Sequence, residues 1–352
     1  MSKLSIIILC TFIKSGEGYF STIQTYTTRI ILALVVLIFP LQQVESAESI
    51  ATIYRISPRL DNGSQFMSIR LLGVVRLANV SRDSIKISEL SDLAWDEDEQ
   101  LLYAVSDQGY LLHLQPVFKN SIIDDVLLSG KHVLLDNSGD RLQGNDADSE
   151  GMDIINSNNN IKGDSELLVS FERNPRIERY SPQGAFLGSH RLPTELVSIK
   201  NYLSKNKALE SVALHPEHGI ITVPERPLTN STKGIFTLYN LQGGNWAYTP
   251  LNTDVSAITS LATLTNGNLM ILERIYSNQY SPFSVAIREL LFSDVYDTPE
   301  IKTLALFKQD DGFLIDNFEG LAHHKENRFF MVSDNNENYF QRTLLMYFEI
   351  LD

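Results

Sequence analysis

The stretch that decides the fold is Phe318-Glu-Gly-Leu-Ala-His-His-Lys-Glu-Asn-Arg-Phe-Phe-Met-Val-Ser-Asp334. Two apolar runs, residues 318–322 and 329–334, flank a polar turn in this stretch. Short apolar runs bounded by turn residues predict β-strands that pair as a hairpin. An acid lies near the start of the first run, and another acid ends the second.

The same two elements recur along the chain. The first reads polar or acidic, small, apolar and then often Ala, and it occurs at Ser91-Asp92-Leu93-Ala94, Ser149-Glu150-Gly151-Met152, Leu209-Glu210-Ser211-Val212-Ala213, Ile258-Thr259-Ser260-Leu261-Ala262 and Phe318-Glu319-Gly320-Leu321-Ala322. The second is an apolar strand that ends in an acid, at residues 102–107, 167–172, 220–225, 269–273 and 329–334. The first element returns after 58, 60, 49 and 60 residues, and more strand-like runs follow each pair. About four short strands per repeat predict the blades of a β-propeller.

The repeats therefore predict an all-β, single-domain propeller with five blades by repeat count, and six blades as the alternative. The last repeat is short of one strand, and the run Phe66–Leu77 near the N-terminus can supply it. Pairing the two ends of the chain would close the ring and remove an exposed sheet edge.

Composition excludes several kinds of chemistry. The 352 residues carry a formal net charge of -14, which excludes a generic nucleic-acid binder because such proteins need a concentrated basic surface. Cys10 is the only cysteine. The body of the protein can therefore form no disulfide, no thiolate metal site and no cysteine nucleophile.

The N-terminal segment has the features of a secretory signal. Ile30–Phe39 is an apolar run of ten residues that follows Arg29, and small residues precede Ala47 as in a cleavage site. We expect residues 1–46 to be removed on export and residues 47–352 to form the domain. The 29 residues ahead of the run indicate either a downstream start or a long signal.

The predicted location follows from this segment. Without residues 1–46 the net charge is -15, and no run of 18 apolar residues follows Phe39. We therefore expect a periplasmic or extracellular monomer without a membrane span.

The recurrent acids predict a site on the axis of the ring. First strands of blades line the central channel, so Asp92, Glu150, Glu210 and Glu319 should converge and repel one another unless a cation or an arginine neutralises them. Oxygen ligands without thiols or a zinc-type histidine spacing favour Ca²⁺ as the cofactor. The alternative is that each acid caps backbone amides or pairs with an arginine of the next blade.

Two acidic clusters extend the predicted ligand set. Asp146, Asp148 and Glu150 match positions 1, 3 and 5 of a calcium-binding EF-hand loop, but the glutamate at position 12 is missing. They indicate either a partial calcium loop at the channel rim or a solvated turn. Asp334 lies in a similar cluster of acids and amides and completes the predicted metal ligands.

Arginine follows three of the strand-ending glutamates, as Glu172-Arg173, Glu225-Arg226 and Glu273-Arg274. Adjacent strand residues face opposite sides, so an arginine can reach the channel only where the strand has ended. There its planar group could hold phosphate oxygens. Pairing between blades is the favoured reading of any single arginine.

These elements together resemble the phytase-like family, also described as esterase-like activity of phytase. The resemblance rests on the Glu-Gly or Glu-Ser elements, on residues 168–177 and on Ser333-Asp334-Asn335-Asn336, and it spans roughly residues 70–350. It implies an exported propeller whose glutamates and aspartates hydrolyse phosphoesters. Thr259 departs from the pattern, because an acid is expected there.

Two functions are consistent with these features. In the first, Ca²⁺ offsets phosphate charge while Glu150, Glu210, Glu319, Glu172 and Arg173 serve as catalytic residues on a small phosphoester. In the second, the propeller is a non-catalytic scaffold that binds a component of the cell envelope.

Overall fold

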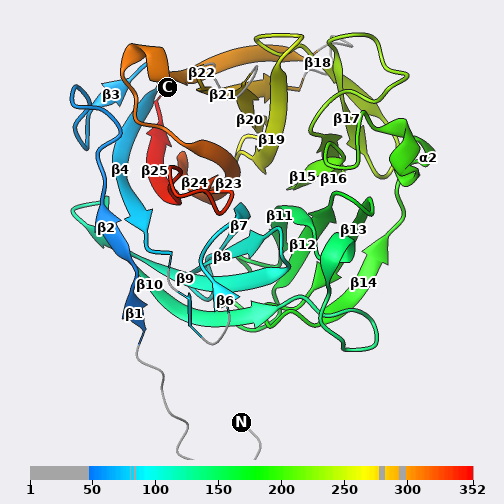
Figure 1. The fold of residues 1–352 in the computed structure, drawn as a ribbon, viewed down its shortest axis with the longest axis horizontal. Coiled ribbons are helices and arrows are strands. Elements are labelled where there is room, and N and C mark those ends of the chain that lie inside the picture. Colours follow the sequence, from blue (N-terminus) through cyan, green and yellow to red (C-terminus); the bar gives the residue numbers. More distant parts are fainter. Residues whose placement is uncertain (1–46, 80, 83–84, 277–281, 293–298, 352) are drawn as a thin grey trace, which may run out of the picture. The chain divides into compact units, whose positions relative to one another are not determined.

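The computed structural model describes residues 47–351 except for 80, 83–84, 277–281 and 293–298. The predicted export segment, residues 1–46, lies outside the described residues, so its cleavage stays a prediction. Within the described part, five antiparallel sheets surround a common axis (Figure 1). The five-bladed propeller is confirmed, and the described residues give no sixth blade.

The first three blades follow the chain in order. Blade 1 comprises β7 (Leu90–Asp96), β8 (Leu101–Ser106), β9 (Tyr110–Lys119) and β10 (Ile122–Val133), with β1 (Glu48–Ser49) at its outer edge. Blade 2 comprises β11 (Ser149–Ile155), β12 (Glu166–Phe171), β13 (Arg176–Tyr180) and β14 (Phe186–His190). Blade 3 comprises β15 (Leu209–His215), β16 (Gly219–Pro224), β17 (Phe236–Asn240) and β18 (Asn245–Tyr248).

The last two blades differ in how they are completed. Blade 4 is again sequential, with β19 (Ser256–Thr263), β20 (Leu269–Ile275), β21 (Ser284–Leu291) and β22 (Glu300–Lys308). Blade 5 joins β23 (Asn317–Lys325), β24 (Arg328–Asp334) and β25 (Leu344–Ile350) to three N-terminal strands, β4 (Ile69–Leu77), β2 (Ala51–Ile53) and β3 (Gln65–Phe66). Pairing of β4 with β25 closes the ring, as predicted.

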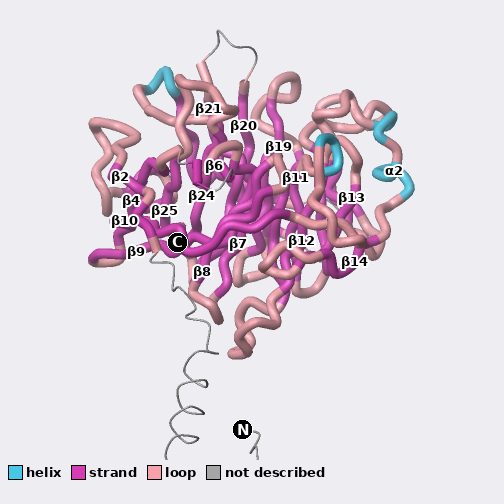
Figure 2. Tube along the Cα trace, turned by 60° about the horizontal axis from the view of Figure 1, so that its bottom comes forward, coloured by secondary structure: helices cyan, strands magenta, loops and turns pink. Residues whose placement is uncertain are grey.

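The remaining elements are short and lie outside the blades (Figure 2). They are the hairpin of β5 (Ser81–Arg82) and β6 (Ile85–Lys86), the helix α2 (Thr194–Val197), and the 3-10 turns η1 (Gly144–Asp146), η2 (Ile199–Asn201) and η3 (Gln309–Asp311). None of the described helices is long and apolar enough to cross a membrane.

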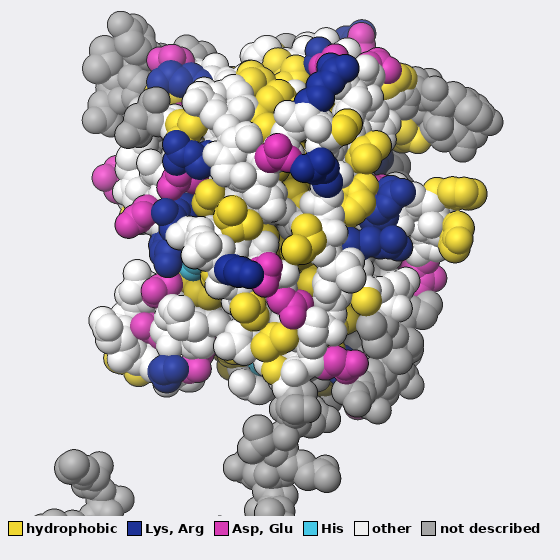
Figure 3. Space-filling view, turned by 90° about the vertical axis from the view of Figure 1, so that its left-hand side faces the viewer, with side chains coloured by type: hydrophobic (Ala, Val, Ile, Leu, Met, Phe, Trp, Pro, Cys, Tyr) yellow, Lys and Arg dark blue, Asp and Glu magenta, His cyan; other side chains and the backbone are white. Residues whose placement is uncertain are grey.

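The core is divided among the contacts between neighbouring blades. Five buried apolar clusters occur in the described part of the chain, and each joins two adjacent blades. Leu93 of β7, for example, packs with Phe330 of β24 and Leu345 of β25. Apolar side chains project from both faces of every blade and are buried against the two neighbouring blades. Burial of this apolar surface stabilises the whole ring. On the outside, around β2, β4 and β10, acidic and basic side chains are interspersed with scattered apolar ones (Figure 3).

The inner strands approach one another closely at one level of the channel. A Cβ at Gly151 would lie 2.5 Å from Ser211 Cα, and a Cβ at Gly320 would lie 2.7 Å from Asp92 Cα. Only glycine fits at such distances. This close approach explains why the first sequence element carries a small residue after its acid.

Asp92 fills the axis at this level. Its Oδ1 accepts hydrogen bonds from Leu93 N (2.9 Å), Leu321 N (2.8 Å) and Ser260 Oγ (3.0 Å), and its Oδ2 accepts one from Met152 N (2.8 Å). The side chain is fully buried. Burial raises the pKa of Asp92, while its hydrogen-bond donors oppose that rise. One carboxylate thus connects β7, β11, β19 and β23.

We predict that Asp92→Ala lowers the free energy of unfolding by at least about 3 kcal/mol, because three backbone amides and a hydroxyl lose their buried acceptor. Chemical denaturation followed by circular dichroism measures this. Asp136→Ala is the matched control, since Asp136 also accepts two backbone hydrogen bonds, but in a surface turn. The control should lose about 1 kcal/mol or less. Equal losses in the two variants would contradict the role of Asp92.

Candidate functional site

Each inner strand has a break in register within its first five residues. The paired residues jump from Leu90 to Asp92, from Ser149 to Met152, from Leu209 to Ser211, from Ile258 to Ser260 and from Phe318 to Gly320. A bulge of this kind turns one side chain out of the regular alternation. The residues at the break are Ser91, Glu150, Glu210, Thr259 and Glu319.

A second set of side chains comes from the ends of the neighbouring strands. In the same register, the corresponding residues lie at or next to the ends of β8, β12, β16, β20 and β24, and they are Asp107, Glu172, Glu225, Arg274 and Asp334. Nine of these ten side chains, all but Thr259, line one cavity of about 180 Å³ at the mouth of the channel. The cavity walls carry eight carboxylates and two cations, Lys207 and Arg274.

One side of this acidic cavity is neutralised by the two cations. Arg274 bonds Glu319 (2.5 Å), Glu225 (2.7 Å) and the side-chain oxygen of Asn317 (2.6 Å). Lys207 bonds the other oxygen of Glu225 at 2.5 Å. Burial lowers the pKa of Arg274, but Glu319 and Glu225 outweigh it and raise that pKa overall. Arg274 therefore remains charged and fixes this wall of the cavity.

The other side holds carboxylates without such partners. Among the described residues, no lysine or arginine forms an ion pair with Glu150, Glu172 or Glu210. Side-chain oxygens of Glu172, Glu210 and Glu225 lie within 4.8 Å of one another, and so do those of Asp148, Glu150 and Glu172. Glu172 belongs to both groups. Like charges gathered this closely repel unless protons or a cation neutralise them.

Burial and this crowding raise the pKa of several carboxyl groups. Burial, reinforced by Glu210 and Glu172, raises the pKa of Glu150 well above its usual range. Burial, followed by Glu225 and Glu172, does the same to the pKa of Glu210. The pKa of Glu172 rises to about 8, mainly through burial and then through Asp148.

Asp107 and Asp334 face the same cavity. Burial and then Glu89 raise the pKa of Asp107 to about 8, and burial and then Glu319 raise the pKa of Asp334 to about 8. Oδ1 of Asp107 is buried, and none of the residues that the structure describes forms a hydrogen bond with it. Since buried polar atoms are nearly always bonded, this oxygen is available to a ligand in the cavity.

One family model matches most of the chain. A model described as phytase-like, esterase-like activity of phytase, matches residues 85–337. The chain belongs to the phytase-like family. A solved structure titled "Structure of Dos1 propeller" is similar at 10% identity over 86% of this chain and 82% of that one, with a TM-score of 0.36. No curated protein matched the chain.

This phytase-like propeller brings most of the predicted site residues together. Glu150, Glu172, Glu210, Glu319 and Asp334 line the acidic cavity. Asp148 lies against it, with an oxygen close to those of Glu150 and Glu172.

Three predicted site residues lie elsewhere. Asp92 is the axial acceptor described above, one residue beyond the bulge, and Ser91 takes the cavity position instead. Asp146 is exposed and accepts a hydrogen bond from the side chain of Asn174, so the EF-hand-like spacing does not gather its acids at one point. Arg173 is half-exposed, pairs with Asp148 at 2.6 Å and does not line the cavity.

The other two glutamate–arginine pairs take opposite roles. Arg226 turns away and bonds the backbone oxygens of Ser256 and Asp254. Glu273 is fully buried between blades, where it accepts hydrogen bonds from Arg288 and Tyr248. In that pair the arginine, Arg274, reaches the cavity.

Sequence reasoning omitted five charged residues of the cavity from the predicted ligand and catalytic sets. They are Glu89, Asp107, Lys207, Glu225 and Arg274. The run Leu269–Glu273 is one residue shorter than its four counterparts, and extending it by one residue would have placed Arg274 beside the strand-ending acids. Lys207 lies in the loop before β15, where the strand repeats carry no signal.

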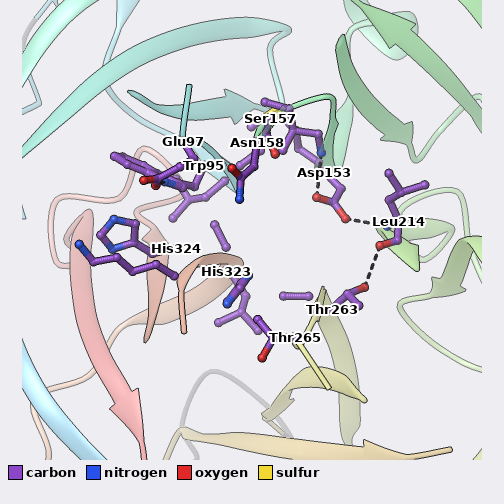
Figure 4. A pocket seen from close by; sticks show the side chains of 18 of the residues that line it. Trp95, Glu97, Asp153, Ser157, Asn158, Leu214, Thr263, Thr265, His323 and His324 are labelled. Carbon is purple, nitrogen blue, oxygen red and sulfur yellow. Dashed lines mark hydrogen bonds between the residues drawn. The ribbon is translucent and has the colours of Figure 1, made fainter. Parts of the chain in front are cut away.

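The opposite mouth of the channel has a different character (Figure 4). This cavity of about 430 Å³ is lined by the far ends of the inner strands. Asp153 accepts hydrogen bonds from Leu214 N (2.6 Å) and Ile154 N (2.8 Å), and burial raises its pKa to about 6. On the other side Trp95 packs edge-on against His324, which bonds Tyr347. None of the described carboxylates that line this larger cavity belongs to a group of closely spaced acids such as those of the acidic cavity.

We predict that Arg274→Met lowers the free energy of unfolding by about 3 kcal/mol in the presence of EDTA, because Glu319 and Glu225 are left buried with less neutralising charge. The matched control is Arg173→Met, an arginine that also follows a strand-ending glutamate but is half-exposed. It should change stability by about 1 kcal/mol or less. Chemical denaturation of both variants measures the difference, and an Arg274→Met variant as stable as the control would contradict the assigned ion pairs.

Proposed function

We propose that this phytase-like propeller is a calcium-dependent hydrolase of phosphoesters that acts at the acidic cavity. The observation that supports this most directly is the gathering of carboxylate oxygens within bridging distance in two groups, Glu172 with Glu210 and Glu225, and Glu172 with Asp148 and Glu150. Family membership supports a hydrolase of the esterase or phytase type.

The donor set fits a calcium ion. The described polar side chains of the cavity offer carboxylate, hydroxyl and amide groups and two cations, with no imidazole and no thiol. Calcium takes six to eight oxygen ligands at about 2.3–2.6 Å, so two ligand oxygens on one ion lie up to about 5 Å apart. Within each of the two groups of carboxylates the candidate ligand oxygens all lie within 4.8 Å of one another, so each group satisfies this condition. Glu172 and Glu210 would hold the ion with Glu225, and the alternative ligand group is Glu172 with Asp148 and Glu150.

A bound calcium ion would offset the charge of a phosphoryl group and polarise it. The protein's own groups would handle the protons. Asp107 and Asp334, each with a pKa raised to about 8, hold a proton near neutral pH and can exchange it with water or with a leaving alcohol. Arg274 holds Glu319 and Glu225 in place beside them.

In the proposed hydrolysis a water oxygen bonds to phosphorus as the phosphorus–oxygen bond to the alcohol breaks. The alcohol oxygen takes the electron pair and a proton, and the water gives up a proton to a carboxylate. The substrate is a small phosphoester rather than a nucleic acid, and the enzyme acts as a monomer outside the cytoplasm after loss of residues 1–46. The alternative is a scaffold that binds an envelope component without turnover. In that case an ion in the same cavity would only stabilise the fold.

We predict that calcium raises the melting temperature of the wild-type protein, since a ligand that binds only the folded state adds about 2.7 kcal/mol at a hundredfold excess over Kd. Glu210→Gln should lose most of this gain and should be at least as stable as wild type in EDTA, because a neutral amide avoids the charge that burial and the neighbouring carboxylates disfavour. Glu319→Gln is the matched control, from the same bulge position, and should be less stable in EDTA because Arg274 loses a partner. Differential scanning calorimetry with and without calcium measures all three proteins. A calcium-indifferent wild type would contradict the metal site.

We predict hydrolysis of p-nitrophenyl phosphate or bis-p-nitrophenyl phosphate that EDTA abolishes and added calcium restores. Glu172→Gln should reduce kcat/KM by at least about a hundredfold, because Glu172 belongs to both groups of candidate ligands. Release of p-nitrophenol measures the rate. Calcium binding without turnover of either ester would favour the scaffold.

A further inference from the structure

A second hollow of about 610 Å³ continues from the acidic cavity. The two share Lys207, Arg274, Asn317 and Asn336 as lining residues. Any molecule bound between these four side chains therefore touches both spaces. The hollow lies on the side of the cavity that the cations neutralise.

The hollow is bounded by aromatic and aliphatic side chains as well as by polar ones. Phe340 is 82% exposed and Tyr276 is 42% exposed, and both line it together with Phe283 and Ile315. Tyr276 and Phe283 meet edge-on with their ring centroids 5.9 Å apart. Exposed aromatic residues gathered beside a polar site mark a surface that binds apolar groups. We name this hollow the aromatic groove.

The cations at this junction are already occupied. Lys207 pairs with Glu225, and Arg274 pairs with Glu225 and Glu319. Arg342, on the far wall of the groove, pairs with Asp316 at 3.3 Å. A substrate with many phosphate groups needs several unpaired cations to neutralise it. With eight carboxylates next to these paired cations, the site repels every phosphate that a bound ion does not neutralise.

We propose, on the basis of the hydrolase function above, that the substrate is an ester of a single phosphate group with an alcohol that carries an aromatic or similarly flat apolar group. The phosphate lies in the acidic cavity, and the apolar group lies in the aromatic groove against Phe340 and Tyr276. Arg274 and Lys207 border the phosphate on the groove side. Hydrolysis releases that alcohol and inorganic phosphate, and water supplies the fourth phosphate oxygen.

Two kinds of measurement test this. The first compares kcat/KM for phenyl phosphate, methyl phosphate and inositol hexakisphosphate in the calcium-loaded protein. The second measures binding of phenylphosphonate and methylphosphonate by isothermal titration calorimetry, which needs no turnover. We expect phenyl compounds to be preferred over methyl ones by at least about tenfold, since aromatic contacts contribute roughly this much. We expect the hexakisphosphate to be the poorest substrate.

The variants are Phe340→Ala and Tyr276→Ala, with Tyr339→Ala as the matched control. Tyr339 is 94% exposed beside Phe340 and borders a different hollow. The first two variants should lose the preference for phenyl compounds and keep their values for methyl compounds, whereas the control should keep the preference.

Turnover of methyl phosphate without a preference for phenyl compounds, or a preference that survives both variants, would overturn the proposed substrate class and leave the hydrolase intact. Efficient hydrolysis of the hexakisphosphate would also overturn it. Failure to hydrolyse any ester would remove the hydrolase function itself, and the substrate class with it.

Discussion

The carboxylate of Asp92 accepts four hydrogen bonds at the axis of the ring, from β7, β11, β19 and β23. At the same level the neighbouring backbone leaves no room for a Cβ at Gly151 or Gly320. The inner strands and this carboxylate therefore fill the channel. The two mouths are thereby separated into cavities with different linings. The acidic cavity is consequently small, with crowded carboxylates that cannot move apart along the channel.

Blade 4 breaks the symmetry of that cavity. In the positions where blades 2, 3 and 5 each present two acids, it presents Thr259 and Arg274, and Thr259 points its hydroxyl at the backbone oxygen of Phe318. Arg274 neutralises the neighbouring Glu225 and Glu319 through ion pairs, and Thr259 adds no negative charge. Glu150, Glu172 and Glu210 lie on blades 2 and 3 and form no ion pair with any lysine or arginine in the described part of the chain. A site for an ion and a site for the groups around a substrate can therefore lie side by side in one ring of similar strands.

Much of this could be predicted from the sequence because the fold repeats. The spacing of the acids predicted five blades, and the short last repeat predicted that β4 pairs with β25. Membership of the phytase-like family agrees with the resemblance of the repeated elements. Glu150, Glu210 and Glu319 could be placed together because each occupies the same position in its blade.

The site residues that were misplaced from the sequence share one physical cause, the bulge in each inner strand. A break in register changes which residue faces the channel mouth, so Asp92 and Ser91 exchange the roles that simple alternation assigns to them. The same one-residue shift decides that Arg274, and not Glu273, enters the cavity. Asp146 and Asp148 are close in sequence, but only Asp148 lies within reach of the glutamates.

The central claim is that Glu172 and Glu210 hold a cation rather than protons alone. It is tested most directly by a crystal structure of the protein grown with calcium, with the ion located by its anomalous scattering. We expect an anomalous peak within about 2.3–2.6 Å of oxygens of Glu172 and Glu210. An acidic cavity free of any such peak at saturating calcium, with these glutamates bonded to one another through shared protons, would contradict the account.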